Sequence, residues 1–157
     1  MTEGGDAVPA TGRVLGLDHG DARIGVAISD PGRRLAVPLG TIHTGAPADL
    51  KAVASLVREH GIVAIVVGLP LSMSGAAGTR ADHAEAFAGA LRTFLQVPVE
   101  LEDERLSTAE AERALAAAGA SARERKRASD RSAATVILQS WLDRRRGTSA
   151  TAGPSRT

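Results

Sequence analysis

The sequence contains no cysteine, so it can form no disulfide, no thiolate nucleophile and no cysteine-bound zinc site. Aromatic residues are only 2% of the chain, too few for a protein that grips single strands on stacked aromatic platforms. No apolar run approaches the roughly 20 residues of a membrane-spanning helix. Residues 1–12 also lack the charged-then-apolar layout of a signal peptide. These absences favour a cytoplasmic protein with no membrane partner.

The remaining composition is that of a single globular domain. The chain has 157 residues, of which 43% are hydrophobic and 24% are charged. Both ends are rich in small and polar residues and show no apolar periodicity. We therefore expect disordered tails at residues 1–12 and 147–157, and one folded domain at residues 13–146.

Charge is unevenly distributed along the chain, although the net charge is only +1. Residues 98–112 contain six acids and one base, whereas residues 123–146 contain eight bases and three acids. An acidic site beside a basic region suits a metal-dependent enzyme that acts on a polyanion. The same imbalance could arise by chance on two solvated helix faces, and charge alone does not separate these interpretations.

Hydrophobic periodicity predicts an α/β fold with the element order β-β-β-α-β-α-β-α-α. Short turns join the first three strands, so we expect them to form an antiparallel meander. The fourth strand is apolar at every position, which is typical of a central parallel strand covered on both faces. Strands are expected at residues 14–17, 24–28, 35–42, 62–67 and 97–101, and helices at 50–60, 84–95, 107–119 and from 121 onward.

Acidic residues follow two of the strands that should run parallel. Asp18 follows the first strand, and the acidic run Glu102–Glu104 follows the fifth. Because the carboxyl ends of parallel strands meet at one edge of a sheet, where ligands bind in open α/β folds, these side chains should lie close together. The pattern does not choose among the three acids of the run.

The last predicted helix offers a third acid. Helical spacing places Asp130 on the same face as Ala133, Ala134, Ile137 and Trp141, so its carboxylate should point inward. A helix-terminal charge or a salt bridge to an arginine would explain it equally well. Converging carboxylates can instead hold two Mg²⁺ or Mn²⁺ ions that promote phosphodiester hydrolysis.

Asp30 is excluded from this set. It ends the second strand, which runs away from Asp18, and it precedes Pro31, so we interpret it as a turn residue.

Four motifs stand in order along the chain: Leu15–Gly20 with Arg23–Pro31, Val67–Leu71 with Gly75, Gly78 and Arg80, Asp103–Thr108 with Glu110–Glu112, and Asp130 with Ala133, Ala134 and Ile137–Gln139. Together they resemble the signatures of the YqgF/RuvX family. The resemblance implies an RNase H-like fold: a mixed five-stranded sheet, order 3-2-1-4-5, with helices on both faces. It also implies a nuclease that matures the 5′ end of pre-16S rRNA or resolves Holliday junctions.

The resemblance also implies a set of site residues. It carries over Asp18, Glu104 and Asp130 as the catalytic, metal-binding acids, and so selects Glu104 from the acidic run. His19 is interpreted as incidental. Basic residues near the motifs are candidates for binding nucleic acid phosphates. These are Arg23, Arg80, Arg105, Arg123, Arg125, Lys126, Arg127 and Arg131.

The leading hypothesis is therefore an endonuclease that uses Mg²⁺ or Mn²⁺ and acts on structured RNA or branched DNA. A junction substrate would require a homodimer, because two strands must face two sites. A non-catalytic nucleic-acid-binding or ribosome-assembly factor would keep the basic surface but need no metal. An actin-like ATPase or sugar kinase opens with a similar strand, but it clamps nucleotide between two such domains. The glycine spacing does not fit a dinucleotide-binding fold.

Overall fold

The computed structural model describes residues 8–71, 78–106 and 132–152, with side chains described up to residue 146. Five strands form one sheet in the order β3-β2-β1-β4-β5, which confirms the predicted order. Strands β1, β2 and β3 are antiparallel neighbours, and β4 runs parallel to both β1 and β5. The predicted helix at residues 107–119 lies outside the described residues. The helical region predicted from residue 121 onward is described only from residue 132, where it forms the last helix. The elements are β1 (Arg13–His19), β2 (Arg23–Ser29), β3 (Ala36–His43), α1 (Ala48–His60), β4 (Ile62–Leu69), α2 (Thr79–Phe94), β5 (Val99–Asp103) and α5 (Ala133–Ala152).

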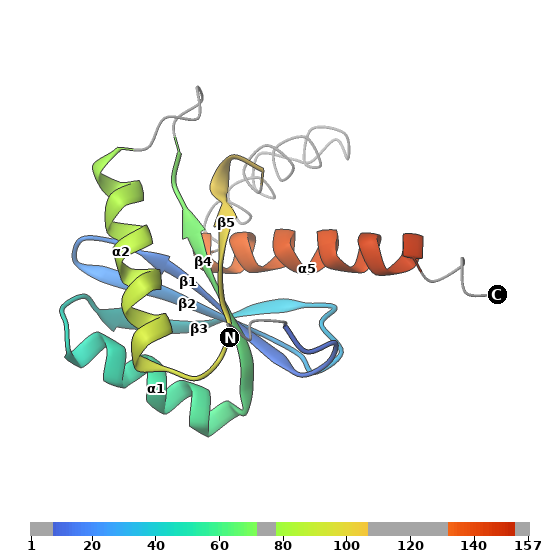
Figure 1. Cartoon of the computed structure of the whole chain (residues 1–157), viewed down its shortest axis with the longest axis horizontal. Helices are drawn as coiled ribbons and strands as arrows, with labels where there is room; N and C mark the ends of the chain where they lie inside the picture. The colour runs from blue at the N-terminus through green and yellow to red at the C-terminus, as the bar shows by residue number, and fades with distance from the viewer. Residues whose placement is uncertain (1–7, 72–77, 107–131, 153–157) are drawn as a thin grey trace, which may run out of the picture.

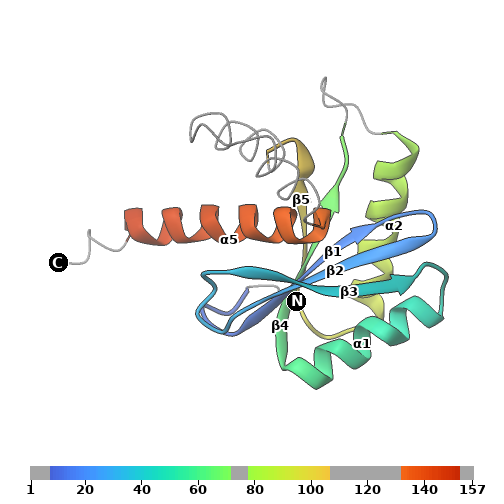
Figure 2. The same ribbon diagram turned by 180° about the vertical axis from the view of Figure 1, so that it is seen from behind.

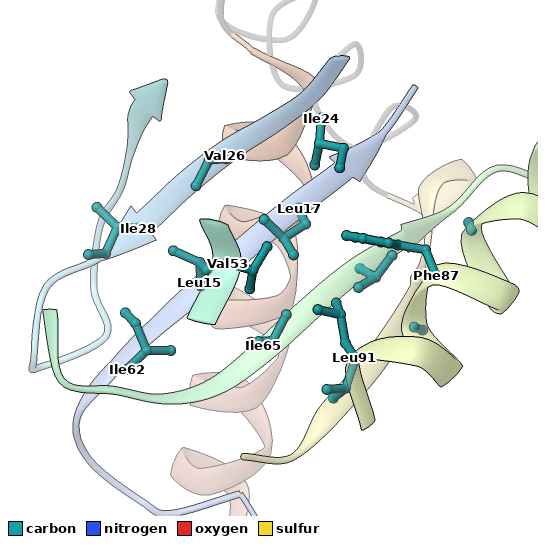
Figure 3. Close-up of a cluster of buried hydrophobic side chains, with 14 residues drawn as sticks. Leu15, Leu17, Ile24, Val26, Ile28, Val53, Ile62, Ile65, Phe87 and Leu91 are labelled. Carbon is teal, nitrogen blue, oxygen red and sulfur yellow. The ribbon is translucent and has the colours of Figure 1, made fainter. Parts of the chain in front are cut away.

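The helices cover both faces of the sheet, as Figures 1 and 2 show. Helices α1 and α2 lie on one face and α5 lies on the other. Alternation along β1 explains the two cores: Leu15 and Leu17 point toward α1 and α2, whereas Val14 points toward α5. Figure 3 shows Phe87 and Leu91 of α2 packed over the first of these cores.

Helix α5 approaches the sheet closely because β1 carries a glycine beneath it. A Cβ on Gly16 would lie 2.7 Å from Leu138 Cβ and 3.2 Å from the Ala134 carbonyl oxygen. A larger residue there would push the helix off the sheet. The first turn of α5, which Ala134 belongs to, is thereby seated over β1 and β2.

Several element boundaries differ from the sequence prediction by a few residues, and two of these differences concern the site. Strand β5 spans residues 99–103 rather than 97–101, because Pro98 has no N–H for the ladder and contributes only its carbonyl, which accepts from Ile65 N–H at 2.9 Å. Glu102 and Asp103 therefore lie inside β5, and only Glu104 follows it. Likewise Asp18 lies inside β1 rather than after it.

The chain ends are more structured near the domain than the sequence pattern indicates. Helix α5 continues to Ala152, past the predicted domain end at Arg146. Before β1, the Arg33 guanidinium donates to the carbonyls of Gly12 at 2.9 Å and Thr11 at 3.2 Å. None of the helices in the described ranges is long and apolar enough to cross a membrane.

Candidate active site

Asp18 lies on the α5 face of the sheet, between two strands that carry glycine beside it. Its register partner on β2 is Gly25. On β4, Gly68 follows Val67, the partner of Leu17, and is therefore the neighbour of Asp18 on the other side. Neither glycine projects a side chain over the carboxylate, so the surface around Asp18 is open at this sheet edge.

Gly68 provides the space that Glu104 occupies. A Cβ on Gly68 would lie 2.7 Å from Glu104 Oε2 and 2.5 Å from Ile137 Cδ1. Contacts this short are essentially never made by a real Cβ, so no larger residue fits here without displacing Glu104 or α5. The Glu104 carboxylate therefore leans over β4 toward Asp18. The sequence pattern does not reveal that Gly68 leaves space for Glu104, because nothing local distinguishes this glycine from any other glycine at the end of a strand.

Glu104 and Asp18 interact electrostatically. Burial and, after it, the charge of Asp18 raise the pKa of Glu104 to about 7. A hydrogen bond with Asp18, which requires a proton on Glu104, acts in the same direction, while the Arg80 charge opposes it.

The two acids before Glu104 are each engaged elsewhere. Glu102 is 2% exposed, accepts a hydrogen bond from Ser140 Oγ at 3.2 Å and forms an ion pair with Arg144. Asp103 forms an ion pair with Arg105 at 2.7 Å. The hydrogen bonds from Arg105 hold the pKa of Asp103 below its usual value. Only Glu104 of the run faces Asp18.

The predicted phosphate-binding arginines have different surroundings. The Arg105 guanidinium is bonded to Asp103. Arg80 lies in the first turn of α2, and its charge reaches Glu104. Arg23 opens β2 and is exposed. Within the described ranges, neither Arg80 nor Arg23 forms an ion pair.

His19 lies on the opposite face of β1 from Asp18. Its ring packs against Phe87, with 4.8 Å between centroids, and burial lowers its pKa. This is a packing position beside α2, in keeping with its interpretation as incidental. Asp30 is confirmed as a turn residue: its carboxylate accepts hydrogen bonds from three backbone N–H groups of the β2–β3 turn, which lower its pKa.

Asp130 lies outside the described residues, as do five of the predicted phosphate-binding residues: Arg123, Arg125, Lys126, Arg127 and Arg131. The described part of the last helix, α5, begins at Ala133, and Ser132 Oγ caps it by accepting from Thr135 N–H at 3.1 Å. Ala134, Ile137 and Trp141 are buried as predicted, while Ala133 is exposed.

The described residues alone contain no cluster of three or more acidic, histidine or cysteine side chains suited to a metal ion. What they contain is a pair of carboxylates, Asp18 and Glu104, at the carboxyl edge of the sheet.

The fold is that of the RNase H-like nucleases. The solved structure described as "T. thermophilus RuvC in complex with Holliday junction substrate" matches with a TM-score of 0.56 at 19% sequence identity, covering 87% of this chain and 96% of that one. A second Thermus thermophilus RuvC structure matches with a TM-score of 0.52.

The family follows from sequence comparison. The model of the family described as "RuvX: Holliday junction resolvase" matches residues 12–144, so the chain belongs to the RuvX family. Relatives named "Putative pre-16S rRNA nuclease" are 48% identical in Pelotomaculum thermopropionicum, over 83% of this chain and 86% of the relative, and 52% identical in Anaeromyxobacter sp. strain Fw109-5, over 85% and 98%.

Proposed function

We propose that this protein is a metal-dependent endonuclease that processes the 5′ end of pre-16S rRNA in the cytoplasm. The observation that carries the proposal is the pair formed by Asp18 and Glu104 across Gly68. Burial and the Asp18 charge raise the pKa of Glu104 to about 7, so the pair favours a proton or a bound cation beside its oxygens. The names of the relatives support pre-16S rRNA as the substrate.

The donor set fits a hard divalent cation. Carboxylate oxygens are the ligands that Mg²⁺ and Mn²⁺ prefer, and such a cation would take the place of the proton on Glu104. Asp18 and Glu104 would hold it together with Asp130, which we retain as the third acid. Two bound ions would activate a water and stabilise the leaving oxygen of a phosphodiester.

The chain's own residues then have distinct tasks. Asp18 and Glu104 would hold the cations, and they would do so in their ionised forms. Arg80 favours the ionised form of Glu104 and lies where it can also position a substrate phosphate. In-line attack of water on phosphorus would leave 5′-phosphate and 3′-hydroxyl ends.

A Holliday junction is the second candidate substrate, favoured by the description of the family. It would require two copies of the chain, each presenting one site to one strand. A non-catalytic assembly factor is disfavoured, because a partly buried pair of like charges costs stability and gains nothing for binding nucleic acid alone.

The test is cleavage of a pre-16S 5′-end fragment and a four-way DNA junction side by side, each with Mg²⁺, Mn²⁺ or chelator. We expect metal-dependent cleavage of the RNA that Asp18→Asn and Glu104→Gln abolish. Asp103→Asn is the matched control, since it removes a neighbouring acid that is bonded to Arg105. Cleavage in chelator would overturn the proposal, and cleavage of the junction alone would replace its substrate.

A further inference from the structure

We propose that Arg23 and His43 form a phosphate-binding subsite beside the carboxylates, which holds the substrate strand on the β3 side of the cleavage point. The inference deepens the proposed function and rests on it for the identity of the strand. It assigns a role to His43, and it gives the strand a direction across the sheet.

The register places both side chains on the face that carries Asp18. Asp18 pairs with Gly25, and Arg23 is two residues from Gly25 on the same strand, so both project to the α5 face. Arg23 in turn pairs with His43 on β3, and paired residues of antiparallel strands share a face. Strands lie about 4.8 Å apart, so β3 is roughly 10 Å from β1. The pair is therefore within one or two nucleotides of the carboxylates.

Nothing on the described surface occupies these two side chains. Both are exposed. The ion pairs of the described residues involve other cations: Arg105 with Asp103, His60 with Glu59, and three arginines of α5 with acids of β5 and α5. The nearby carboxylate of Asp21 lies 3.9 Å from His83 Nδ1. An arginine and a histidine that face one another across two strands can both donate hydrogen bonds to a phosphate oxygen that lies between them, and the guanidinium adds a fixed positive charge.

The backbone beneath the pair is held in place. Thr44, which follows His43, donates from its N–H to the carbonyl of Ala22 at 3.1 Å and from Oγ1 to the carbonyl of Gly20 at 2.7 Å. These bonds tie the end of β3 to the β1–β2 turn. A subsite built on strand ends tied in this way binds without first having to order a loop.

The rest of the edge gives the path of the strand. Gly25 separates Asp18 from Thr41 on β3 and projects no side chain. Figure 2 shows the β1–β2 turn, the end of β3 and α2 at one end of the molecule. Arg80 lies in the first turn of α2, which packs against β4 and β5, and its charge acts on Glu104. A strand that crosses from β3 toward β5 would meet Arg23 and His43, then the carboxylates, then Arg80.

The first arm of the test measures binding in chelator, where cleavage plays no part. The probe is a fluorescent pre-16S 5′-end fragment, with the full chain as Arg23→Gln, His43→Gln and the double variant. Arg34→Gln is the matched control, since Arg34 is an exposed arginine of the β2–β3 turn, beyond the opposite ends of these strands. We expect Kd to rise about tenfold for Arg23→Gln and severalfold for His43→Gln. For Arg23→Gln, the slope of log Kd against log salt concentration should also fall by about one, because one fewer phosphate is neutralised.

The second arm places single neutral methylphosphonate linkages on either side of the cleavage point. One of these linkages, on one side of the cleavage point only, should lower the kcat/KM of the wild type about as much as the double substitution does. The same linkage should cause no further loss of kcat/KM in the double variant. Additive losses, or a double variant that binds like Arg34→Gln, would overturn the subsite while leaving the proposed nuclease intact. If the variants lose binding but the wild type cleaves nothing, the subsite stands and the proposed nuclease activity is refuted.

Discussion

Replacing Asp18 with asparagine should abolish cleavage and yet stabilise the metal-free protein above neutral pH. In the native state Glu104 has a pKa of about 7, against 4.5 for the free side chain. Its ionisation is therefore penalised only when the protein is folded. The penalty is absent below about pH 4.5, grows as the pH rises and is complete above pH 7.

The magnitude follows from the same two values. Each pKa unit corresponds to about 1.4 kcal/mol, which sets an upper limit of about 3 kcal/mol on the penalty. Glu104 is only partly buried, so solvent screening reduces this to about half. Burial is the larger cause and the Asp18 charge the second. Removing that charge should therefore recover about 1 kcal/mol at pH 8 and nothing at pH 4, or a rise in Tm of about 2–4 °C at the higher pH.

Thermal unfolding in chelator at the two pH values measures this effect. Asp103→Asn is the control of opposite sign: Arg105 lowers the pKa of Asp103, so that carboxylate contributes stability above its unfolded pKa and its loss should destabilise the protein at pH 8. Adding Mg²⁺ should raise the wild-type midpoint more than that of Asp18→Asn. If Asp18→Asn is the less stable protein at pH 8, the Asp18 charge is paired with a cation, and our account of the site is wrong.

Three further outcomes follow from the contacts described. Gly68→Ala should cost about 1–3 kcal/mol of stability and weaken Mn²⁺ binding in calorimetry, because its Cβ would collide with Glu104. The control Gly89→Ala in α2 has no atom within 4 Å of its Cβ and should stabilise the protein by about 0.5–1 kcal/mol. Equal effects of the two substitutions would contradict the close approach of Glu104 to Gly68. Arg144→Met should cost about 3 kcal/mol in urea unfolding, since it leaves the buried Glu102 carboxylate without its cation, and a loss below about 1 kcal/mol would show that other groups neutralise it. Mn²⁺ affinity should fall up to about tenfold per pH unit below pH 7 and level off above it, because the proton on Glu104 must leave first; a flat profile would remove Glu104 from the metal site.

Local patterns in the sequence were sufficient for the elements and their order along the chain. The apolar run of β4, the short turns between the first three strands and the glycine that ends α1 each reflect a short-range constraint, whereas the order of the strands in the sheet came from the resemblance to a family. Gly61 ends α1 with a φ of 64°, a conformation that glycine adopts without steric cost. The position of Asp18 at the carboxyl edge followed from the same reasoning, because parallel strands must end together.

The choice among the acids of β5 depended on the tertiary structure. The residue pattern alone left Glu102, Asp103 and Glu104 open, and resemblance to a family selected Glu104 without a physical reason. That reason lies in partners that are distant in sequence: Ser140 and Arg144 of α5 engage Glu102. Equally, no local signal shows that Gly68 must lack a side chain, since the atoms its Cβ would strike belong to Glu104, which follows β5, and to Ile137 of α5, and both reach Gly68 only after folding. Periodicity encodes which face a residue takes, whereas the charge and space around it are set by elements that meet only in the folded chain.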